Sequence, residues 1–127
     1  PPAWAIGRMA TMDLEIAGYQ VPRKSIVLLS PYTMHRSPKY WPEPDRFHPE
    51  RWETEDPGRP KFAYYPFGGG PRLCIGERFA WMEGVIILAA LARKWRFRRT
   101  DTAPVALAPL LTLRAKGGLR LRAEARY

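Results

Sequence analysis

Residues 66–76 read PFGGGPRLCIG, and no other segment constrains the structure of this chain as strongly. Three consecutive glycines free the backbone to turn tightly and to approach a flat ligand or its own side chains closely. Arg72 offers a guanidinium fork that suits a carboxylate. Cys74 stands just before a predicted helix, where unpaired amides and the positive end of the helix dipole stabilise a thiolate. The segment therefore predicts a thiolate on a rigid loop beside an anion-binding arginine, with Gly76 leaving room for a bulky group.

Other roles for Cys74 compete with this interpretation. A lone cysteine is most often a small buried hydrophobic residue. A phosphate loop would end in Gly-Lys-Ser/Thr and a dinucleotide loop would read Gly-x-Gly-x-x-Gly, and the segment matches neither pattern. A nucleophilic cysteine would need a histidine base, and His35 and His48 are far away in sequence, which does not exclude them in space. The segment alone leaves these roles open.

The residues that follow the glycine-rich segment predict the one long helix of the chain. Residues 76–93 contain no proline, and Phe79, Met82 and Ile86 recur at helical spacing. The second half of this helix is apolar all round, so we expect it to be buried on several sides.

The remaining segments predict short, irregular elements. Residues 1–36 are expected to form β-hairpins and a turn, with a hairpin around Ala17-Gly18, a buried strand at 26–29 and a helical turn at 31–35. Residues 37–66 contain seven prolines and predict an ordered meander. Four aromatic residues are expected to pin it: Trp41, Phe47, Trp52 and Phe62. Residues 94–127 predict a β-hairpin tail that pairs 111–115 with 119–123 across Lys116-Gly117-Gly118.

Composition and charge narrow the function classes. The 127 residues are 46% hydrophobic, near the globular average, while 14 prolines and 10 glycines indicate many turns. The formal charge is +9, and ten Lys/Arg against two Asp/Glu from Arg93 onward supply +8 of it. Such a basic end suits nucleic acid, an anionic membrane, an acidic protein or plain solvent.

The numbers of cysteine and histidine residues exclude a disulfide-bonded scaffold and a zinc site with four Cys or His ligands. One cysteine cannot form an internal disulfide, and one cysteine with two histidines cannot supply a zinc tetrad. The longest apolar run, residues 85–92, is too short to span a membrane. The chain starts at Pro1 with no signal peptide, and we expect it to be a piece of a longer protein.

The five residues Phe67, Gly70, Arg72, Cys74 and Gly76 complete a specific pattern. Their spacing, Phe-x-x-Gly-x-Arg-x-Cys-x-Gly, resembles the haem-binding signature of the cytochrome P450 family. The resemblance implies that Cys74 is the thiolate ligand of the iron of haem b, that Phe67 packs beside the sulfur and that Arg72 pairs with a haem propionate. It spans nearly the whole chain, residues 1–123.

Other segments match the same family. Residues 47–52, FHPERW, resemble the Phe-x-Pro-Glu-Arg-Phe segment of its meander, which implies a structural role for Glu50 and Arg51 through an upstream helix. Residues 35–38, HRSP, resemble its His-Arg-Asp-Pro turn, with Ser37 where aspartate is common. Pro1-Pro2 followed by Arg8 implies that Arg8 meets the second propionate. The resemblance also implies a set of substrate-facing residues: Ala3, Trp4, Ala5, Ile6, Leu110 and Leu111.

The expected fold class is therefore mixed α+β and coil-rich, a carboxy-terminal fragment of the mainly helical cytochrome P450 fold. Residues 1–127 would belong to a single domain, with 67–76 as the haem-binding loop. The implied activity is insertion of one atom of dioxygen into a small organic substrate, with electrons from a ferredoxin or flavoprotein reductase that docks on the Cys74 side. In the family, a distal helix carries the acid and threonine that deliver protons to bound dioxygen, and no segment of this chain corresponds to it. We therefore expect the chain alone to be inactive and marginally folded.

Two alternatives stay open at this stage. The first is a free-standing haem-binding fragment without turnover, and the second is a basic polyanion-binding module. We expect no nucleic-acid partner for the basic tail. The arginine- and alanine-rich composition suggests a cytoplasmic, bacterial-type enzyme, and any membrane anchor would lie upstream of Pro1.

Overall fold

A computed structural model describes residues 1–54 and 56–126, so Glu55 of the expected meander and Tyr127 of the expected tail lie outside the described residues. The chain divides into two compact units. The first contains Pro1 and Ala3–Pro66, and the second contains Pro2 and the residues from Phe67 onward. The expected assignment of all 127 residues to one domain stays a prediction.

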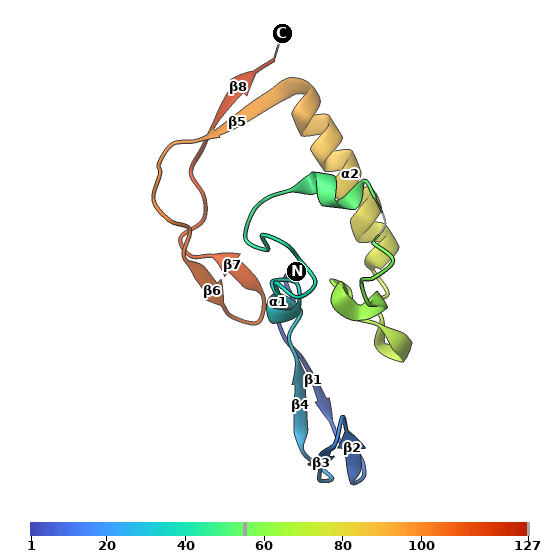
Figure 1. Ribbon diagram of the computed structural model, residues 1–127. Coiled ribbons are helices and arrows are strands. Elements are labelled where there is room, and N and C mark those ends of the chain that lie inside the picture. The colour runs from blue at the N-terminus through green and yellow to red at the C-terminus, as the bar shows by residue number, and fades with distance from the viewer. Residues whose placement is uncertain (55, 127) are drawn as a thin grey trace. The chain divides into compact units, whose positions relative to one another are not determined.

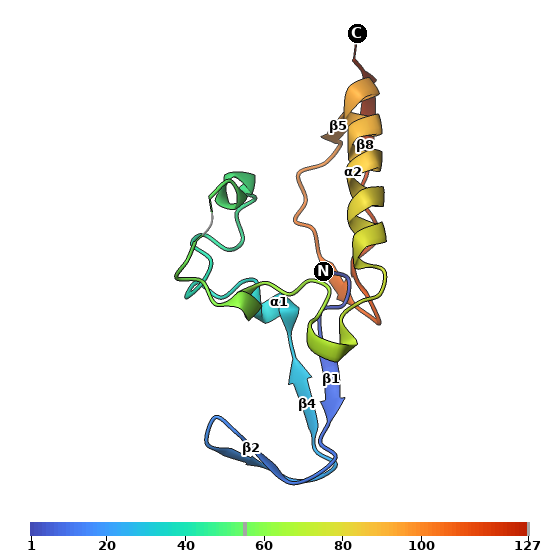
Figure 2. The ribbon, with the colours of Figure 1, turned by 90° about the vertical axis from the view of Figure 1, so that its right-hand side faces the viewer.

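Two antiparallel strand pairs begin the first unit (Figure 1 and Figure 2). Strand β1 (Ile6–Met9) pairs with β4 (Ile26–Leu29), and β2 (Leu14–Ile16) pairs with β3 (Tyr19–Val21). The β2–β3 hairpin is confirmed, and its turn residues Ala17 and Gly18 have φ angles of 50° and 86°. Positive φ at both positions is typical of a type I′ turn, whose twist matches that of the strands it joins.

The prediction that residues 26–29 form a buried strand is only half right. The strand exists, but Ile26 is 72% exposed and Leu28 is 70% exposed. A two-stranded ladder shields neither of its faces by itself, and no described residue lies over this part of β4. Continuous apolar character therefore predicted the strand correctly and its surroundings wrongly.

The expected helical turn is present as α1 (Pro31–Met34). Ser30 caps it, because its Oγ accepts a hydrogen bond from the backbone N–H of Thr33 at 3.2 Å. The same hydroxyl donates to the carbonyl oxygen of Trp4 at 3.1 Å. This side chain thus fixes the start of the helix and ties it to the first residues of the chain.

The meander is ordered around Trp41 rather than around all four expected aromatic residues. It contains the 3-10 turns η1 (Pro49–Trp52) and η2 (Lys61–Ala63). Trp41 is 3% exposed and donates its indole N–H to the carbonyl oxygen of Ala63 at 3.2 Å. The Trp52 ring, although 53% exposed, lies 5.4 Å from it and 4.6 Å from the ring of Tyr64. Phe47 and Phe62 are 91% and 56% exposed and make no aromatic ring contact among the described residues. Only two of the four aromatic residues therefore pin the meander in this chain.

The second unit is built around the long helix, which forms as expected. After the 3-10 turn η3 (Gly70–Arg72), α2 extends over Glu77–Lys94. The expectation that α2 is buried on several sides is wrong for the described residues, since Val85 is 63% exposed and Leu88 is 69% exposed. No described layer covers its apolar positions.

The predicted tail hairpin is also wrong. Four strands are present: β5 (Trp95–Arg99), β6 (Leu107–Pro109), β7 (Leu113–Ala115) and β8 (Leu121–Ala125). β7 pairs with β6, and β8 returns to pair with β5 next to the end of α2 (Figure 1). Gly117 and Gly118, with φ angles of 76° and 75°, form a left-handed turn that directs the chain out of the β6–β7 ladder. Alternation along a strand predicts its faces, but it does not predict its partner.

Candidate functional site

The glycine-rich loop that precedes α2 is closed by its own backbone. The N–H of Cys74 donates to the carbonyl oxygen of Phe67 at 3.0 Å, and the N–H of Leu73 donates to that of Gly70 at 3.0 Å. Gly68 and Gly70 have φ angles of 77° and 66°, a left-handed conformation that favours glycine. These glycines therefore let a short segment fold back and present the cysteine at its end.

Cys74 lies at the amino-terminal end of α2. Its carbonyl oxygen accepts from the N–H of Glu77 at 3.3 Å, and the N–H of Ala80 donates to Gly76 at 2.9 Å, so the helix starts directly after the cysteine. The thiol is free and exposed. A helix of 18 residues carries a positive partial charge at this end, which favours an anion there. The position suits a thiolate.

The surroundings of Cys74 fit a flat apolar group with a central metal ion. The thiol has no hydrogen-bond partner among the described residues, and its neighbours Leu73 and Ile75 are 49% and 105% exposed. A Cβ placed on Gly76 would lie 3.8 Å from the Cys74 sulfur, in ordinary contact, so the chain's own packing does not require glycine there. A single sulfur ligand flanked by uncovered apolar side chains is the donor set that haem would use.

Phe67 and Arg72 complete this loop. The Phe67 ring lies 5.9 Å from the ring of Trp81 on α2, which holds the loop against the first turns of the helix. Arg72 ends η3, is exposed and has no carboxylate partner among the described residues. Its guanidinium is therefore available to an anion outside these residues. Five of the six cofactor-binding residues expected from the sequence thus lie in one loop and helix start.

Arg8, the sixth, belongs to the first unit. It lies on β1 opposite Val27, and its Nη1 donates to the carbonyl oxygen of Gly7 at 2.9 Å. The proposed substrate-facing residues are divided in the same way. Ala3, Trp4, Ala5 and Ile6 are in the first unit, and the exposed Leu110 and Leu111 are in the second. Their roles stay predictions.

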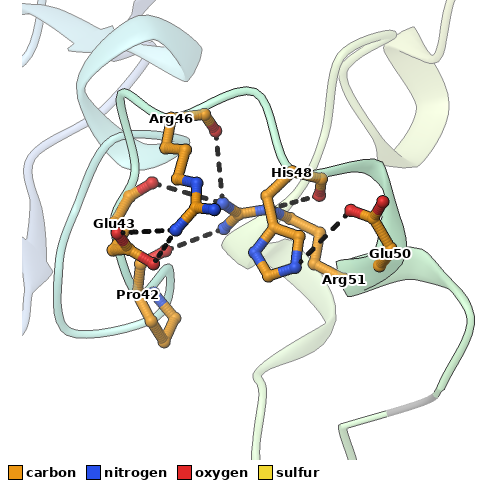
Figure 3. Close-up of polar contacts among 6 residues, drawn as sticks. All are labelled: Pro42, Glu43, Arg46, His48, Glu50 and Arg51. Atoms are coloured by element: carbon orange, nitrogen blue, oxygen red, sulfur yellow. Dashed lines mark hydrogen bonds and ion pairs between the residues drawn. The ribbon is translucent and has the colours of Figure 1, made fainter.

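Arg51 occupies a cage of backbone carbonyls (Figure 3). Its Nε donates to His48 at 3.0 Å and its Nη1 to Pro42 at 3.0 Å, while Nη2 donates to Glu43 at 3.2 Å and Arg46 at 3.4 Å. The sequence predicted a structural role through partners on an upstream helix. Within the described residues the side chain instead holds the meander together by four carbonyl contacts.

Glu50 lies beside this cage and does not enter it. Its Oε2 is 3.5 Å from Nε2 of His48, and both side chains are substantially exposed (Figure 3). An exposed pair at this distance contributes little to stability. The structural role expected for Glu50 stays a prediction.

His35 has a structural role that the sequence did not predict. Its Nε2 accepts a hydrogen bond from the N–H of Tyr65 at 2.9 Å, and its ring lies 4.7 Å from that of Tyr64. Burial, followed by the positive charges of the amino terminus and Arg36, lowers the pKa of His35 from 6.5 to about 4. A neutral imidazole thus anchors the chain immediately before the glycine-rich loop. The sequence named this residue in the HRSP pattern and as a possible base for Cys74, and nothing local predicts a partner 30 residues away.

The described residues contain neither a metal-binding cluster nor a membrane-spanning helix. No group of three or more His, Cys, Asp or Glu side chains is placed to hold a metal ion by itself. Within the same part of the chain, no helix is both long and apolar enough to cross a membrane.

Comparisons with known proteins agree on one family. The family model of cytochrome P450 matches residues 1–119. Cyclooctatin synthase from Streptomyces melanosporofaciens is 42% identical over 127 residues, which cover 99% of this chain and 28% of that protein. The putative cytochrome P450 132 of Mycobacterium tuberculosis is 40% identical over 118 residues, 93% of this chain and 26% of the relative.

A human relative and a cyanobacterial structure also match nearly the whole chain. Human cytochrome P450 4V2 is 38% identical over 121 residues, 94% of this chain and 23% of the relative. The structure of retinoic acid bound cyanobacterial CYP120A1 matches 99% of this chain and 29% of its own with a TM-score of 0.91 and 27% identity. The chain thus spans about a quarter of the length of the proteins that it matches.

Proposed function

Because this chain belongs to the cytochrome P450 family, we propose that it forms the haem-binding, carboxy-terminal portion of a haem-thiolate monooxygenase, with Cys74 as the axial ligand of haem b. The expected fold class is confirmed, since this coil-rich α+β chain matches a cytochrome P450 structure with a TM-score of 0.91. The monooxygenase activity and the substrate belong to the whole protein and are proposals for this chain.

One observation carries the proposal: an exposed thiol at the start of α2, on a loop that its own backbone closes. The Cys74 sulfur would hold the iron as a thiolate, whose negative charge the helix dipole favours. Phe67 would pack beside the sulfur. By resemblance to the family, Arg72 would pair with one propionate and Arg8 with the other. Bound haem supplies the redox chemistry by which this family inserts an atom of dioxygen into an organic substrate.

The test is a carbon-monoxide spectrum of the reduced, haem-loaded product of the complete reading frame. The wild-type protein should show the thiolate-type band, and Cys74→Ser should abolish it, because a serine hydroxyl does not replace a thiolate donor. Ile75→Val is the matched control, since it alters the neighbouring exposed side chain and retains the sulfur. A thiolate-type band that persists in Cys74→Ser would rule out the assignment.

The two alternatives predict other results. A haem-binding fragment without turnover would keep the Cys74-dependent band while no substrate is oxidised in the presence of an electron donor. A polyanion-binding module would bind DNA with steep salt dependence, and this binding would survive Cys74→Ser. The cytoplasmic location expected from the sequence stays a prediction.

We also propose that an acidic ferredoxin or flavoprotein reductase docks on the Cys74 side. Arg72 and Arg78 are exposed beside the cysteine, and Arg93 and Lys94 are exposed at the far end of α2. A helix of 18 residues is roughly 27 Å long, and a protein interface of standard size covers such a length. A partner with a matching acidic surface would associate faster at low salt.

Reversing Arg93 and Lys94 to glutamate should therefore slow electron transfer to the whole enzyme, and the effect should shrink as salt is raised. The measurement is the rate of haem reduction after mixing with reduced donor. Lys24→Glu with Lys39→Glu is the control, because it makes the same charge change in the first unit. Equal rates in the wild-type protein and the Arg93/Lys94 variant would contradict the docking proposal.

A further inference from the structure

One face of the β5–β8 ladder is almost entirely basic. Arg96 lies opposite Glu124, and Arg98 lies opposite Arg122. Directly opposed residues of an antiparallel pair project from the same face, so these four side chains lie together. Arg126 is two residues beyond Glu124 and borders a hollow of about 480 Å³ with Arg96 and Glu124. We call this set of residues the basic face: Arg96, Arg98, Arg122, Glu124 and Arg126.

The opposite face of the ladder is apolar. Trp95, Phe97 and Leu121 lie on it and are 40%, 45% and 50% exposed. Its one arginine, Arg99, lies opposite Leu121 and pairs with Asp101 at 2.6 Å. Covering this second face with other parts of a protein would be favourable, since it removes aromatic surface from water. Covering the basic face with an apolar layer would remove several guanidinium groups from water without giving them partners, which is unfavourable. The basic face is therefore the one that stays in water or meets an anion.

The ladder does not neutralise its own charge. The one carboxylate of the basic face, Glu124, lies 3.1 Å from Nε of Arg98, which leaves three of the four arginines without a carboxylate within the described residues. Arg98 and Arg122 are like charges directly opposed across the pair, an arrangement that destabilises a ladder. An external anion bound between Arg98 and Arg122 would offset this repulsion.

We propose that the basic face binds an acidic, extended segment of a partner protein. Alternate residues of a strand are about 7 Å apart, so carboxylates at every second position match the spacing of Arg96 and Arg98. All four cations of the face are arginines, whose planar fork pairs with carboxylates in a bidentate way. The aromatic side chains project from the other face, where they neither stack on bases bound to the arginines nor enter a membrane beneath them.

This inference does not rest on the haem site, so the two proposals fail separately. The experiment measures binding of a labelled peptide of alternating glutamate and serine to the product of the complete reading frame. A peptide in which glutamine replaces glutamate is the neutral probe. Arg96→Gln with Arg122→Gln removes two charges from the basic face, and Lys24→Gln with Lys39→Gln removes two exposed charges from the first unit.

The acidic peptide should bind and the neutral one should not. The Arg96/Arg122 variant should bind the acidic peptide about tenfold more weakly, or about 1.4 kcal/mol, while the Lys24/Lys39 variant keeps the wild-type affinity. Arg126→Gln should also weaken binding, and it leaves the ladder intact because only the backbone of Arg126 bonds to Lys94. Unfolding midpoints and the haem spectrum monitor the fold.

Two results would overturn the proposal. Equal losses in both double variants would mean that the peptide responds to overall charge and not to this face. Tighter binding of double-stranded DNA or phosphatidylserine vesicles than of the acidic peptide, through Arg96 and Arg122, would assign the face to another class of partner.

Discussion

At the scale of single residues, His35 joins the end of α1 to the end of the meander. Its Nε2 must be unprotonated to accept the hydrogen bond from Tyr65, and burial disfavours the charged ring. Pro66 follows Tyr65 directly, and Phe67 begins the loop. Protonation of this imidazole would therefore remove a hydrogen bond from the backbone of Tyr65, the residue before Pro66.

This predicts a specific dependence of stability on pH. The pKa of His35 is about 4 in the folded chain against an ordinary value of 6.5, so only the unfolded state takes up a proton in between. The stabilisation is fully present above about pH 6.5 and is lost as the pH falls toward 4. Replacing His35 with glutamine, which accepts a hydrogen bond and does not titrate, should flatten this fall.

The measurement is the urea concentration at the midpoint of unfolding, between pH 7 and pH 4, for the product of the complete reading frame. His48→Gln is the control, because the His48 imidazole is partly exposed and accepts no backbone N–H among the described contacts. A His35→Gln variant that loses stability with acid as steeply as the wild-type protein would show that the imidazole is not the titrating group.

The sequence predicted the residues of the site better than their partners. Phe67, Gly70, Arg72, Cys74 and Gly76 form one contiguous pattern, and the structure brings them together because they are neighbours in the chain. Arg51 was assigned a structural role, but its four carbonyl contacts depend on how the meander folds back. The contact of His35 with Tyr65 joins residues 30 positions apart, and no local pattern encodes it.

At the scale of elements, short-range patterns were reliable and strand partners were not. The β2–β3 hairpin, α1 and α2 depend on residues within one turn or one helix, and all were predicted. β8 was assigned to β7, whereas it pairs with β5, whose first residue is 26 positions before the first residue of β8. Trp95, Arg96, Phe97 and Arg98 alternate with the period of a strand, so the signal for β5 was present in the sequence.

At the scale of the whole molecule, the apolar residues are mostly uncovered. Among the described residues, only Ala10, Trp41 and Ala63 are buried hydrophobic residues, and the accessible surface is 11186 Å². For a mass of 14.6 kDa, two compact domains of half that mass would together expose roughly 8,000 Å². This excess of accessible surface explains why burial was overestimated for β4 and α2. Their apolar residues follow the expected pattern, but no described residues cover them.

We therefore predict that residues 1–127 made alone fold only marginally. Uncovered Val85, Leu88 and Ile26 surfaces gain nothing from the hydrophobic effect, so the entropy lost on folding is poorly offset. The isolated chain should bind a hydrophobic dye and lose its circular dichroism gradually in urea, whereas the product of the complete reading frame should unfold cooperatively without binding the dye. A sharp transition with no dye binding by the isolated chain would mean that the two units bury these surfaces by themselves, and that a quarter of the cytochrome P450 fold is an independent folding unit.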